Sequence, residues 1–341
     1  MTHPLSDSFC TRYGYSKPNL PYIKGQCLTV QSHEPPAPTN NDCSYDPITA
    51  REREHIHPLK RCILHPPLEG QDGSTIANLE IIETVRAGDS HCAQLVVMQV
   101  KQVSPQNALP MGRRLLAKIY DPLYFDHEQD DADPFLCVDR DYSHETASYM
   151  ALRELYGKIV PYYFGSFTLR WHVDKASTRS VRLILIENIP GTSLQQLNPA
   201  HFSQLHRQSI MKAVIDAETS LYTHNVRHGD MHPRNILVLN AAEAPDARRV
   251  VIIDFGKSST RRTPYLEEEE QYLPGVEISP LLRWNKAWGF WHAFDPWIDW
   301  DWQPWLEYQY AFTRSSITDY MRSVWLPSVV TEAPPPLPNI E

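Results

Sequence analysis

The sequence predicts an α+β protein of two lobes: an antiparallel sheet of five strands with one helix, followed by a mainly helical part. Short β-branched runs separated by turn residues recur through residues 79–189. One stretch among them, 144–155, has apolar residues at helical spacing instead. From residue 201 onward the apolar spacing stays close to 3.6, which indicates that helices dominate the rest of the chain.

The five expected strands divide into a group of three and a group of two. The first three follow each other with tight connections, which favours an antiparallel meander, and the first connection carries a single glycine, Gly88. The last strand ends at Pro190-Gly191, a strong turn signal. The strands are expected at residues 79–86, 93–100, 114–120, 159–167 and 181–189.

Two helices and a hairpin complete the expected framework. In the helix at 144–155, Tyr149, Leu152 and Leu155 form a buried stripe. A longer amphipathic helix at 201–225 leads into a pair of short β-branched runs, 236–239 and 250–253. If these two runs pair, Asp230, Asn235 and Asp254 converge at one end of the hairpin.

The remaining segments are assigned by composition. Residues 1–75 are rich in Pro, Ser, Asn and His and predict an extended, partly disordered tail; residues 329–341 form a second Pro-rich tail. The lobes are then expected at 76–190 and 191–328. Eight of the nine tryptophans lie between Trp284 and Trp325 and are interpreted as core rather than as a ligand site, and a last helix is expected at 310–321.

Charge and hydropathy exclude several classes of partner. The net charge is −9 and no basic block occurs, which argues against nucleic acid. No apolar run approaches the roughly 18–20 residues that span a bilayer, and no secretory signal is recognisable, so we expect no membrane partner and a cytoplasmic or nuclear location. The six cysteines contain no C-x-x-C pair and are interpreted as reduced thiols rather than zinc ligands.

Two polar motifs carry the functional signal. His228-Gly229-Asp230 is followed by Asn235, and the second short strand delivers Asp254-Phe255-Gly256. Together they resemble the catalytic loop and the D-F-G metal loop of the protein kinase superfamily. The variant His-Gly-Asp-x-His-Pro-x-Asn looks most like kinase-like proteins of fungal type and like aminoglycoside and choline phosphotransferases. The resemblance implies a protein kinase-like fold with ATP and Mg²⁺ as cofactors.

The resemblance also implies a role for individual residues. Asp230 would orient an acceptor hydroxyl and accept its proton, while Asn235 and Asp254 would hold Mg²⁺. Lys118, in the third strand, matches the lysine that binds the α- and β-phosphates. We expect Glu145, rather than Glu154, to pair with this lysine, because Glu145 lies four residues before Tyr149 and so on roughly the same helix face.

Other positions match the family less closely. The turn at Gly88 would arch over the ATP phosphates, although the G-x-G-x-x-G pattern is absent and an ordinary hairpin turn is an equal interpretation. Backbone groups from Glu187 to Ile189 would face adenine. Arg234 would contact the transferred phosphate or cap the loop. Gly229 replaces an arginine that meets an activation-loop phosphate in many protein kinases, so we expect no activation by that route.

These observations predict an ATP-dependent phosphotransferase that acts on a protein hydroxyl. A small-molecule kinase is an alternative, favoured by His232 and by the absence of an A-P-E motif. A nucleotide-binding pseudokinase that serves as an interaction module is another, favoured by the poor glycine turn. Protein partners could also bind the Pro-rich tails, such as residues 334–338.

Overall fold

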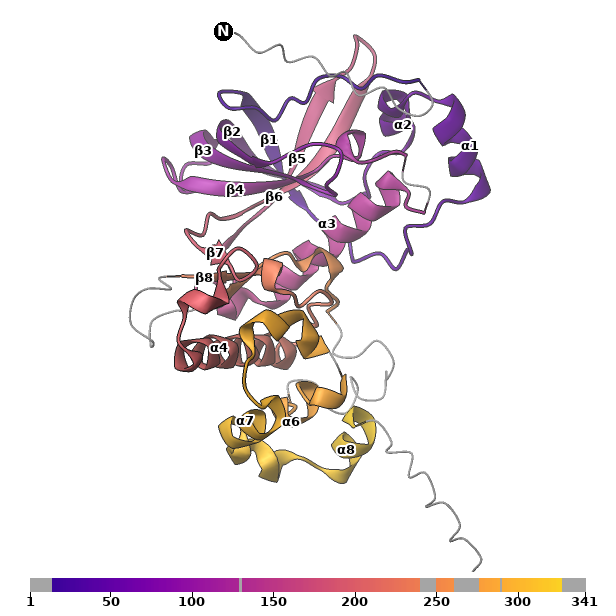
Figure 1. The fold of residues 1–341 in the computed structure, drawn as a ribbon. Helices are drawn as coiled ribbons and strands as arrows, with labels where there is room; N and C mark the ends of the chain where they lie inside the picture. The colour runs from indigo at the N-terminus through magenta and orange to yellow at the C-terminus, as the bar shows by residue number, and fades with distance from the viewer. Residues whose placement is uncertain (1–13, 129–130, 240–249, 261–275, 289, 327–341) are drawn as a thin grey trace, which may run out of the picture.

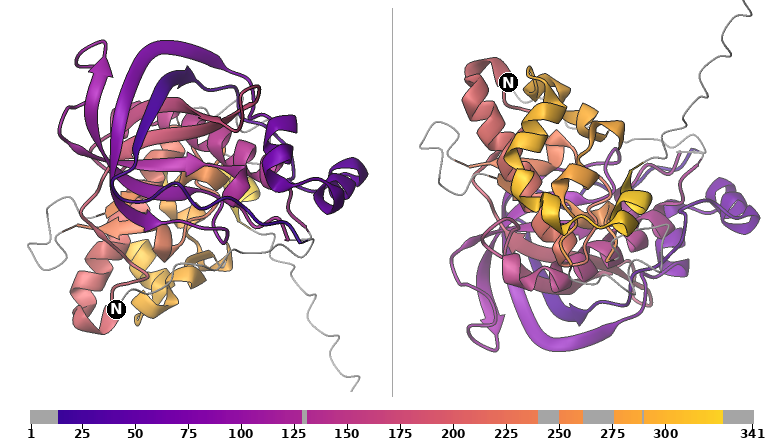
Figure 2. Two further views of the ribbon diagram at one scale, coloured as in Figure 1. Left: turned by 90° about the horizontal axis from the view of Figure 1, so that it is seen from above. Right: turned by 90° about the horizontal axis from the view of Figure 1, so that it is seen from below.

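A computed structural model describes residues 14–128, 131–239, 250–260, 276–288 and 290–326 of the 341-residue chain. The strands of the first half gather at one end of the molecule, and the helices of the second half lie below them (Figure 1). In the view from below, the C-terminal helices lie nearest the viewer, on the side of the molecule away from the strands (Figure 2). No helix of the described residues is long and apolar enough to cross a membrane.

The first half is a closed antiparallel barrel of six strands rather than an open sheet of five. The strand order is β1-β2-β3-β4-β6-β5, and β1 closes the barrel by pairing with both β2 and β5. The five expected strands correspond to β2 through β6, with shifted ends. The bounds are Cys27–Glu34 for β1, Gln71–Arg86 for β2, Gln94–Ser104 for β3, Arg114–Tyr120 for β4, Tyr163–His172 for β5 and Thr178–Glu187 for β6.

The prediction of an extended, partly disordered tail over residues 1–75 is wrong for the part that the structure describes. Strand β1, the helices α1 (Pro47–His55) and α2 (Pro58–Leu64), and the start of β2 all lie in this range. In β1 only Leu28 and Val30 alternate into the barrel core, a signal too short to stand out among the prolines. Residues 1–13 lie outside the described residues.

Helix α3 (Pro134–Ala151) is longer than the expected helix at 144–155 and starts ten residues earlier. Asp133 caps it by accepting a hydrogen bond from the Phe135 amide, and Pro134 occupies the first turn, where its missing amide hydrogen costs nothing. Tyr149 and Leu152 are buried as expected, whereas Leu155 lies in a 3-10 turn beyond α3 and is only half-buried. The helix packs against the segment that follows Asp254, so it links the barrel to the second half.

The second half contains helix α4 (Gln204–Thr223) and a small antiparallel sheet of β7 (Thr192–Ser193), β8 (Ile236–Val238) and β9 (Val250–Ile252). Strands β8 and β9 pair in register, with Ile236 opposite Ile252, so the expected hairpin is confirmed. The connecting residues 240–249 lie outside the described part.

Three short helices close the helical half: α6 (Pro280–Arg283), α7 (Trp302–Gln309) and α8 (Asp319–Trp325). The helix expected at 310–321 is wrong, because a 3-10 turn at Ala311–Ser316 ends before α8 begins. The interpretation of the tryptophans as core is confirmed for four buried ones, Trp284, Trp297, Trp302 and Trp305. The C-terminal Pro-rich tail, 329–341, lies outside the described residues. The cysteines of the described residues are all free thiols.

Candidate functional site

Lys118 lies at the centre of a buried ion cluster built from three elements. Its ammonium donates one hydrogen bond to Glu145 Oε2 on α3 and another to Asp254 Oδ1, at 2.5 Å, in the segment after β9. Lys118 is 7% exposed and Glu145 is fully buried. Glu154, the alternative partner, lies beyond the end of α3 with its side chain 86% exposed. The geometry therefore selects Glu145.

The charges in this cluster alter one another's pKa values. The positive charge of Lys118 is the largest influence on Asp254 and lowers the pKa of its carboxyl to about 2. Burial acts against the charge of Lys118, but the two carboxylates outweigh it and raise the pKa of the lysine. Burial raises the pKa of Glu145 even though Lys118 is beside it. One lysine thus balances two carboxylates, of which Glu145 is buried and Asp254 is partly exposed.

Glu145 accepts a second hydrogen bond, from a residue that the sequence did not point to. The Tyr120 hydroxyl donates a hydrogen bond of 2.6 Å to Oε2, the same oxygen that Lys118 contacts. Tyr120 stands two residues after Lys118 on β4, and this spacing places both side chains on one face of the strand. The other oxygen, Oε1, is buried without a hydrogen-bond partner among the described residues.

The backbone at Asp254 is in the left-handed conformation, with φ of 67°. This conformation is costly for a residue with a side chain and persists only where the surroundings enforce it. The enforcing contacts come from Phe255, whose buried ring lies 5.3 Å from the ring of Tyr149 and 5.0 Å from that of His228. Phe255 therefore anchors the turn that directs Asp254 toward Lys118.

His228 connects the two motifs through both of its ring nitrogens. Nε2 donates to the carbonyl oxygen of Ile253 at 3.0 Å, and Nδ1 accepts from the Asp230 amide at 3.3 Å. This pair of bonds requires the neutral ring, in agreement with a pKa that burial lowers. The loop that carries Asp230 is thereby tied to the residue just before Asp254.

Asp230 is surrounded by hydrogen-bond donors from its own loop. Arg234 Nη2 contacts both carboxylate oxygens, at 2.6 and 2.7 Å, and Asn235 Nδ2 donates to Oδ2 at 2.9 Å. Asn235 in turn accepts a 3.0 Å bond at its backbone oxygen from the Ile253 amide. The structure thus brings Asp230, Asn235 and Asp254 together, as the hairpin of β8 and β9 predicts.

Gly229 is required by its backbone surroundings. Its φ is +74°, and a Cβ at this position would lie 2.1 Å from the carbonyl oxygen of Lys257. No side chain can be accommodated there unless the segment after Asp254 moves. Gly229, which stands where many protein kinases have an arginine, is thus needed because the two motifs approach each other closely at this point.

The turn at Gly88 does not offer the phosphate contact that the sequence led us to expect. The Gly88 amide already donates to Gln94 Oε1 at 2.6 Å. The next residue, Asp89, accepts a 2.8 Å hydrogen bond from Lys17, whose ammonium also contacts the Phe125 carbonyl at 2.6 Å. In this geometry the turn is held by the protein itself, and the amide of Gly88 is not available to a phosphate.

Glu187 and Ile189 lie where the barrel passes into the helical half, at the end of β6 and in the connection to β7. The Glu187 amide donates to the Tyr162 carbonyl at 2.8 Å, and the Ile189 carbonyl accepts from the Gly191 amide at 2.9 Å. The Glu187 amide and the Ile189 carbonyl are therefore engaged within the protein. Adenine would have to bind to the other backbone groups of this connection.

His144 makes a contact between distant segments that the sequence did not predict. The two ring nitrogens of His144, on α3, lie 2.7 Å from the Thr39 carbonyl and 2.5 Å from the Ser258 carbonyl. Ser148, one turn further along α3, bonds the hydroxyl of Ser258 at 2.6 Å. The N-terminal segment is thereby connected to the chain just after the Asp254 motif, more than a hundred residues away.

Residues 111–267 match the ABC1 atypical kinase-like domain. The match covers slightly less than half of the chain and includes Lys118, Glu145 and both motifs, but it excludes the Gly88 turn. No curated protein matches the chain. The similarity supports membership of the protein kinase-like superfamily for this region, and the mixed strand and helix content of the structure fits a kinase-like domain.

The donor set fits a magnesium–nucleotide complex better than a metal held by protein alone. Among the described residues, no group of three or more His, Cys, Asp or Glu side chains is placed to bind a metal ion. Mg²⁺ in such sites is bound by one or two protein oxygens, with phosphates and water completing the shell. Asn235, whose amide nitrogen faces Asp230, and Asp254, which uses Oδ1 for Lys118, each retain an oxygen.

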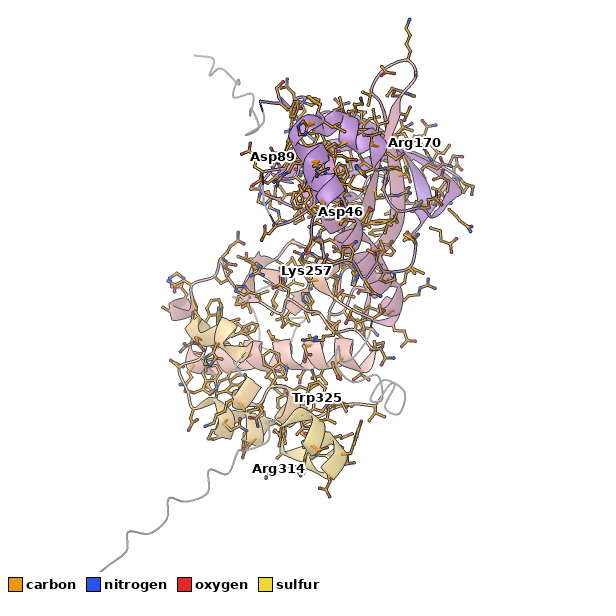
Figure 3. The ribbon with its side chains drawn as sticks, turned by 90° about the vertical axis from the view of Figure 1, so that its right-hand side faces the viewer. Asp46, Asp89, Arg170, Lys257, Arg314 and Trp325 are labelled. Carbon is orange, nitrogen blue, oxygen red and sulfur yellow. The ribbon has the colours of Figure 1, made fainter. Side chains whose placement is uncertain are left out.

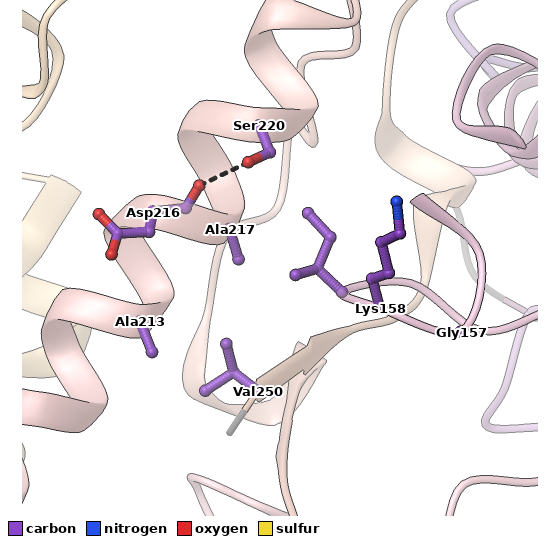
Figure 4. A pocket seen from close by; sticks show the side chains of 8 residues that line it. Gly157, Lys158, Ala213, Asp216, Ala217, Ser220 and Val250 are labelled. Carbon is purple, nitrogen blue, oxygen red and sulfur yellow. Dashed lines mark hydrogen bonds between the residues drawn. The ribbon is translucent and has the colours of Figure 1, made fainter. Parts of the chain in front are cut away.

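A separate pocket lies away from these residues, between α4 and the start of β9 (Figure 4). It has a volume of about 510 Å³ and is open to one side. Its lining is mostly small or apolar, with Asp216 and Lys158 as its only ionisable groups, and it contains none of the candidate site residues. The lining residues are Gly157, Lys158, Ile159, Ala213, Asp216, Ala217, Ser220 and Val250.

Proposed function

We propose that the protein is an ATP-dependent phosphotransferase that transfers the γ-phosphoryl group to a protein Ser or Thr hydroxyl with the aid of Mg²⁺. One observation carries the proposal: Lys118 contacts both Glu145 and Asp254, so a cation for the phosphates is held beside a ligand for the metal. Phosphoryl transfer depends mainly on such positioning and charge neutralisation.

Each residue then has a defined task. Lys118, oriented by Glu145 and Tyr120, binds the α- and β-phosphates. Asn235 and Asp254 would hold Mg²⁺, which neutralises charge on the phosphates when it is bound. Asp230, which is hydrogen-bonded to Asn235 in the same loop, orients the acceptor hydroxyl and receives its proton. Backbone groups between Glu187 and Ile189, other than the engaged Glu187 amide and Ile189 carbonyl, would face the adenine of the nucleotide.

The proposal is tested in two steps with the full chain. Thermal unfolding with and without Mg-ATP measures nucleotide binding, and γ-labelled ATP with protein and small-molecule acceptors then measures transfer. We expect stabilisation by Mg-ATP that is lost in Lys118→Met, and transfer that falls at least 100-fold in Asp230→Asn. Absence of stabilisation would overturn nucleotide binding, and unchanged transfer in Asp230→Asn would overturn the assigned base.

A second function is favoured by the Gly88 turn. Because Gln94 occupies the Gly88 amide, the protein is also a candidate for binding nucleotide without transferring phosphate, as a pseudokinase that presents its surface to a partner. Stabilisation by Mg-ATP with no label transfer to any acceptor would select this function. Measurable transfer that depends on Asp230 would exclude it.

A further inference from the structure

The side chain of Arg234 occupies the carboxylate that would serve as the base. A single nitrogen, Nη2, lies 2.6 Å from Oδ1 and 2.7 Å from Oδ2 of Asp230, and Asn235 takes a further position on Oδ2. A carboxylate offers about four lone-pair positions, and three contacts here are already made. An acceptor hydroxyl therefore meets a carboxylate that is largely covered by its own loop.

Arg234 is well placed to exchange this partner for another. Its side chain is 48% exposed and that of Asp230 is 29% exposed, and ion pairs in such surroundings are weak. Within the described part of the chain the guanidinium contacts only Asp230, through Nη2, which leaves Nε and Nη1 able to donate. Guanidinium groups bind carboxylates and phosphates through two parallel hydrogen bonds, a geometry that one nitrogen on Asp230 does not satisfy.

The neighbouring charges favour an anion over a cation. In the described residues of the two motif segments, 226–239 and 250–260, the only carboxylates are Asp230 and Asp254. The same segments carry Arg227, Arg234 and Lys257, all exposed. Lys257 lies at the junction of the barrel and the helical half (Figure 3).

One further acid, on α3, is itself paired with two basic side chains. Asp141 is paired with Lys257 at 3.1 Å and with Arg140 at 3.2 Å. Among the described residues of these segments and α3, a cationic acceptor would therefore find few unpaired carboxylates beside Asp230 other than those that the chemistry uses.

We propose that the acceptor carries an anionic group, a carboxylate or a phosphate, near its reacting hydroxyl, and that this group binds Arg234 and draws it away from Asp230. The inference rests on the proposed function, and Arg234 is its specificity-determining residue. Binding of the correct acceptor would thus uncover the base, so that an acceptor without the anionic group meets a covered carboxylate.

The transfer step balances without any further reactant. The acceptor oxygen forms a bond to the γ-phosphorus of ATP while the bond between that phosphorus and the bridging β–γ oxygen breaks. ADP leaves with the bonding electron pair, and the hydroxyl proton passes to Asp230. Arg234 takes no part in bond making; it pairs with the anionic group of the acceptor during the step.

The anionic group has two sources, an acidic side chain next to a Ser or Thr in a protein, or an acid on a small hydroxyl compound. One arm of the test compares three serine peptides that differ only in flanking Asp, Ala or Lys residues. The other compares glycerate, glycerol and ethanolamine. We expect kcat/KM at least tenfold higher for the anionic member of one set, and the set in which this occurs identifies the source.

Three variants separate the role of Arg234 from a general loss of activity. In Arg234→Met the preference should fall to less than twofold, through a raised KM for the anionic acceptor, while the neutral acceptor is used as well as before or better. Arg234→Lys should restore part of the preference, because it keeps the charge without the fork. Arg227→Met, which removes a neighbouring exposed arginine, should leave the preference intact.

Two results would overturn the inference: a wild-type preference for the neutral or cationic acceptor, or an equal loss with all acceptors in Arg234→Met. The second would mean that Arg234 binds the nucleotide phosphate instead. A binding measurement tests the anion site independently of whether the protein transfers phosphate. Stabilisation of the Mg-ATP complex by the Asp-flanked peptide or glycerate, lost in Arg234→Met, supports the anion site even where no label is transferred, and its absence together with measurable transfer rejects only the inference.

Discussion

The two ion clusters of the candidate site are built in opposite ways. Lys118 contacts Glu145, 27 residues away, and Asp254, 136 residues away, so that this cluster joins three elements, with Lys118 and Glu145 in the interior and the Asp254 side chain 39% exposed. Asp230 and Arg234 are four residues apart on one loop and remain partly exposed. The first cluster is assembled by the fold as a whole, whereas the second is local.

Because of this difference, we expect the Lys118 cluster to govern the stability of the fold and the Asp230–Arg234 pair to govern the choice of acceptor. Breaking a buried ion pair leaves an uncompensated charge in a low-dielectric interior, while an exposed pair is already solvated. Changes on the Lys118 side should therefore lower the stability of the fold as well as affect the chemistry. Changes at Arg234 should leave the fold intact and act on the choice of acceptor.

The largest effect is expected from Glu145→Ala, which removes the fully buried carboxylate that accepts from both Lys118 and Tyr120 and leaves the lysine paired with Asp254. We expect the free energy of unfolding to fall by about 3–5 kcal/mol in denaturant titrations. Glu154→Ala is the matched control on the exposed surface beyond α3 and should change stability by less than about 0.5 kcal/mol. Equal effects of the two variants would contradict the assignment of Glu145 to the ion cluster.

Gly229→Ala is expected to follow, with a loss of about 2–3 kcal/mol, because the left-handed backbone strain adds to a clash with the Lys257 carbonyl. Gly25→Ala provides the comparison, since Gly25 also has a positive φ, +87°, but has nothing within 4 Å of the added Cβ. It should lose about 1 kcal/mol. If both variants lost the same amount, the close approach of the two motifs would be refuted.

The pH dependence of stability should also report on the buried cluster. The pKa of Asp254 is lowered from 3.8 to about 2 by Lys118, so the ionised form is favoured in the folded state. Its contribution is fully present above pH 4 and is lost as the pH falls toward 2. Unfolding of the wild type and of Asp254→Asn, followed between pH 5 and pH 2, should show a steeper decline in the wild type; parallel curves would contradict it.

The smallest effect on stability is expected at the exposed pair. Arg234→Met should change the free energy of unfolding by no more than about 1 kcal/mol. Its effect should instead be seen in the acceptor preference, measured in the same preparation. A loss comparable with that of Glu145→Ala would mean that the loop depends on this pair for its structure.

The sequence predicted the parts of the site that lie in regular elements. Lys118 and Asp254 were assigned through the resemblance to kinase motifs, and Glu145 through that resemblance together with its position four residues before Tyr149 on one helix face. The state of the Gly88 amide could not be predicted, since it depends on how the Gln94 side chain folds back onto the turn.

The N-terminal segment was mispredicted for a related reason. Strand β1 has only two strongly buried apolar residues, Leu28 and Val30, and its pairing is determined by partner residues that lie 37 to 139 residues later in the chain. The contact of His144 with Thr39 spans 105 residues. Such long-range contacts are produced by tertiary packing and leave no local pattern that periodicity could detect.

The closure of the barrel by β1 has a practical consequence for any shortened form of the protein. The matched kinase-like region starts at residue 111, and the sequence alone would suggest cutting near residue 76. Either cut removes β1, which now pairs with one edge of β2 and one edge of β5. A fragment that begins at residue 76 would expose both edges, and unpaired edges recruit strands from other molecules. Aggregation of such a fragment would therefore reflect the missing strand rather than an unstable catalytic region.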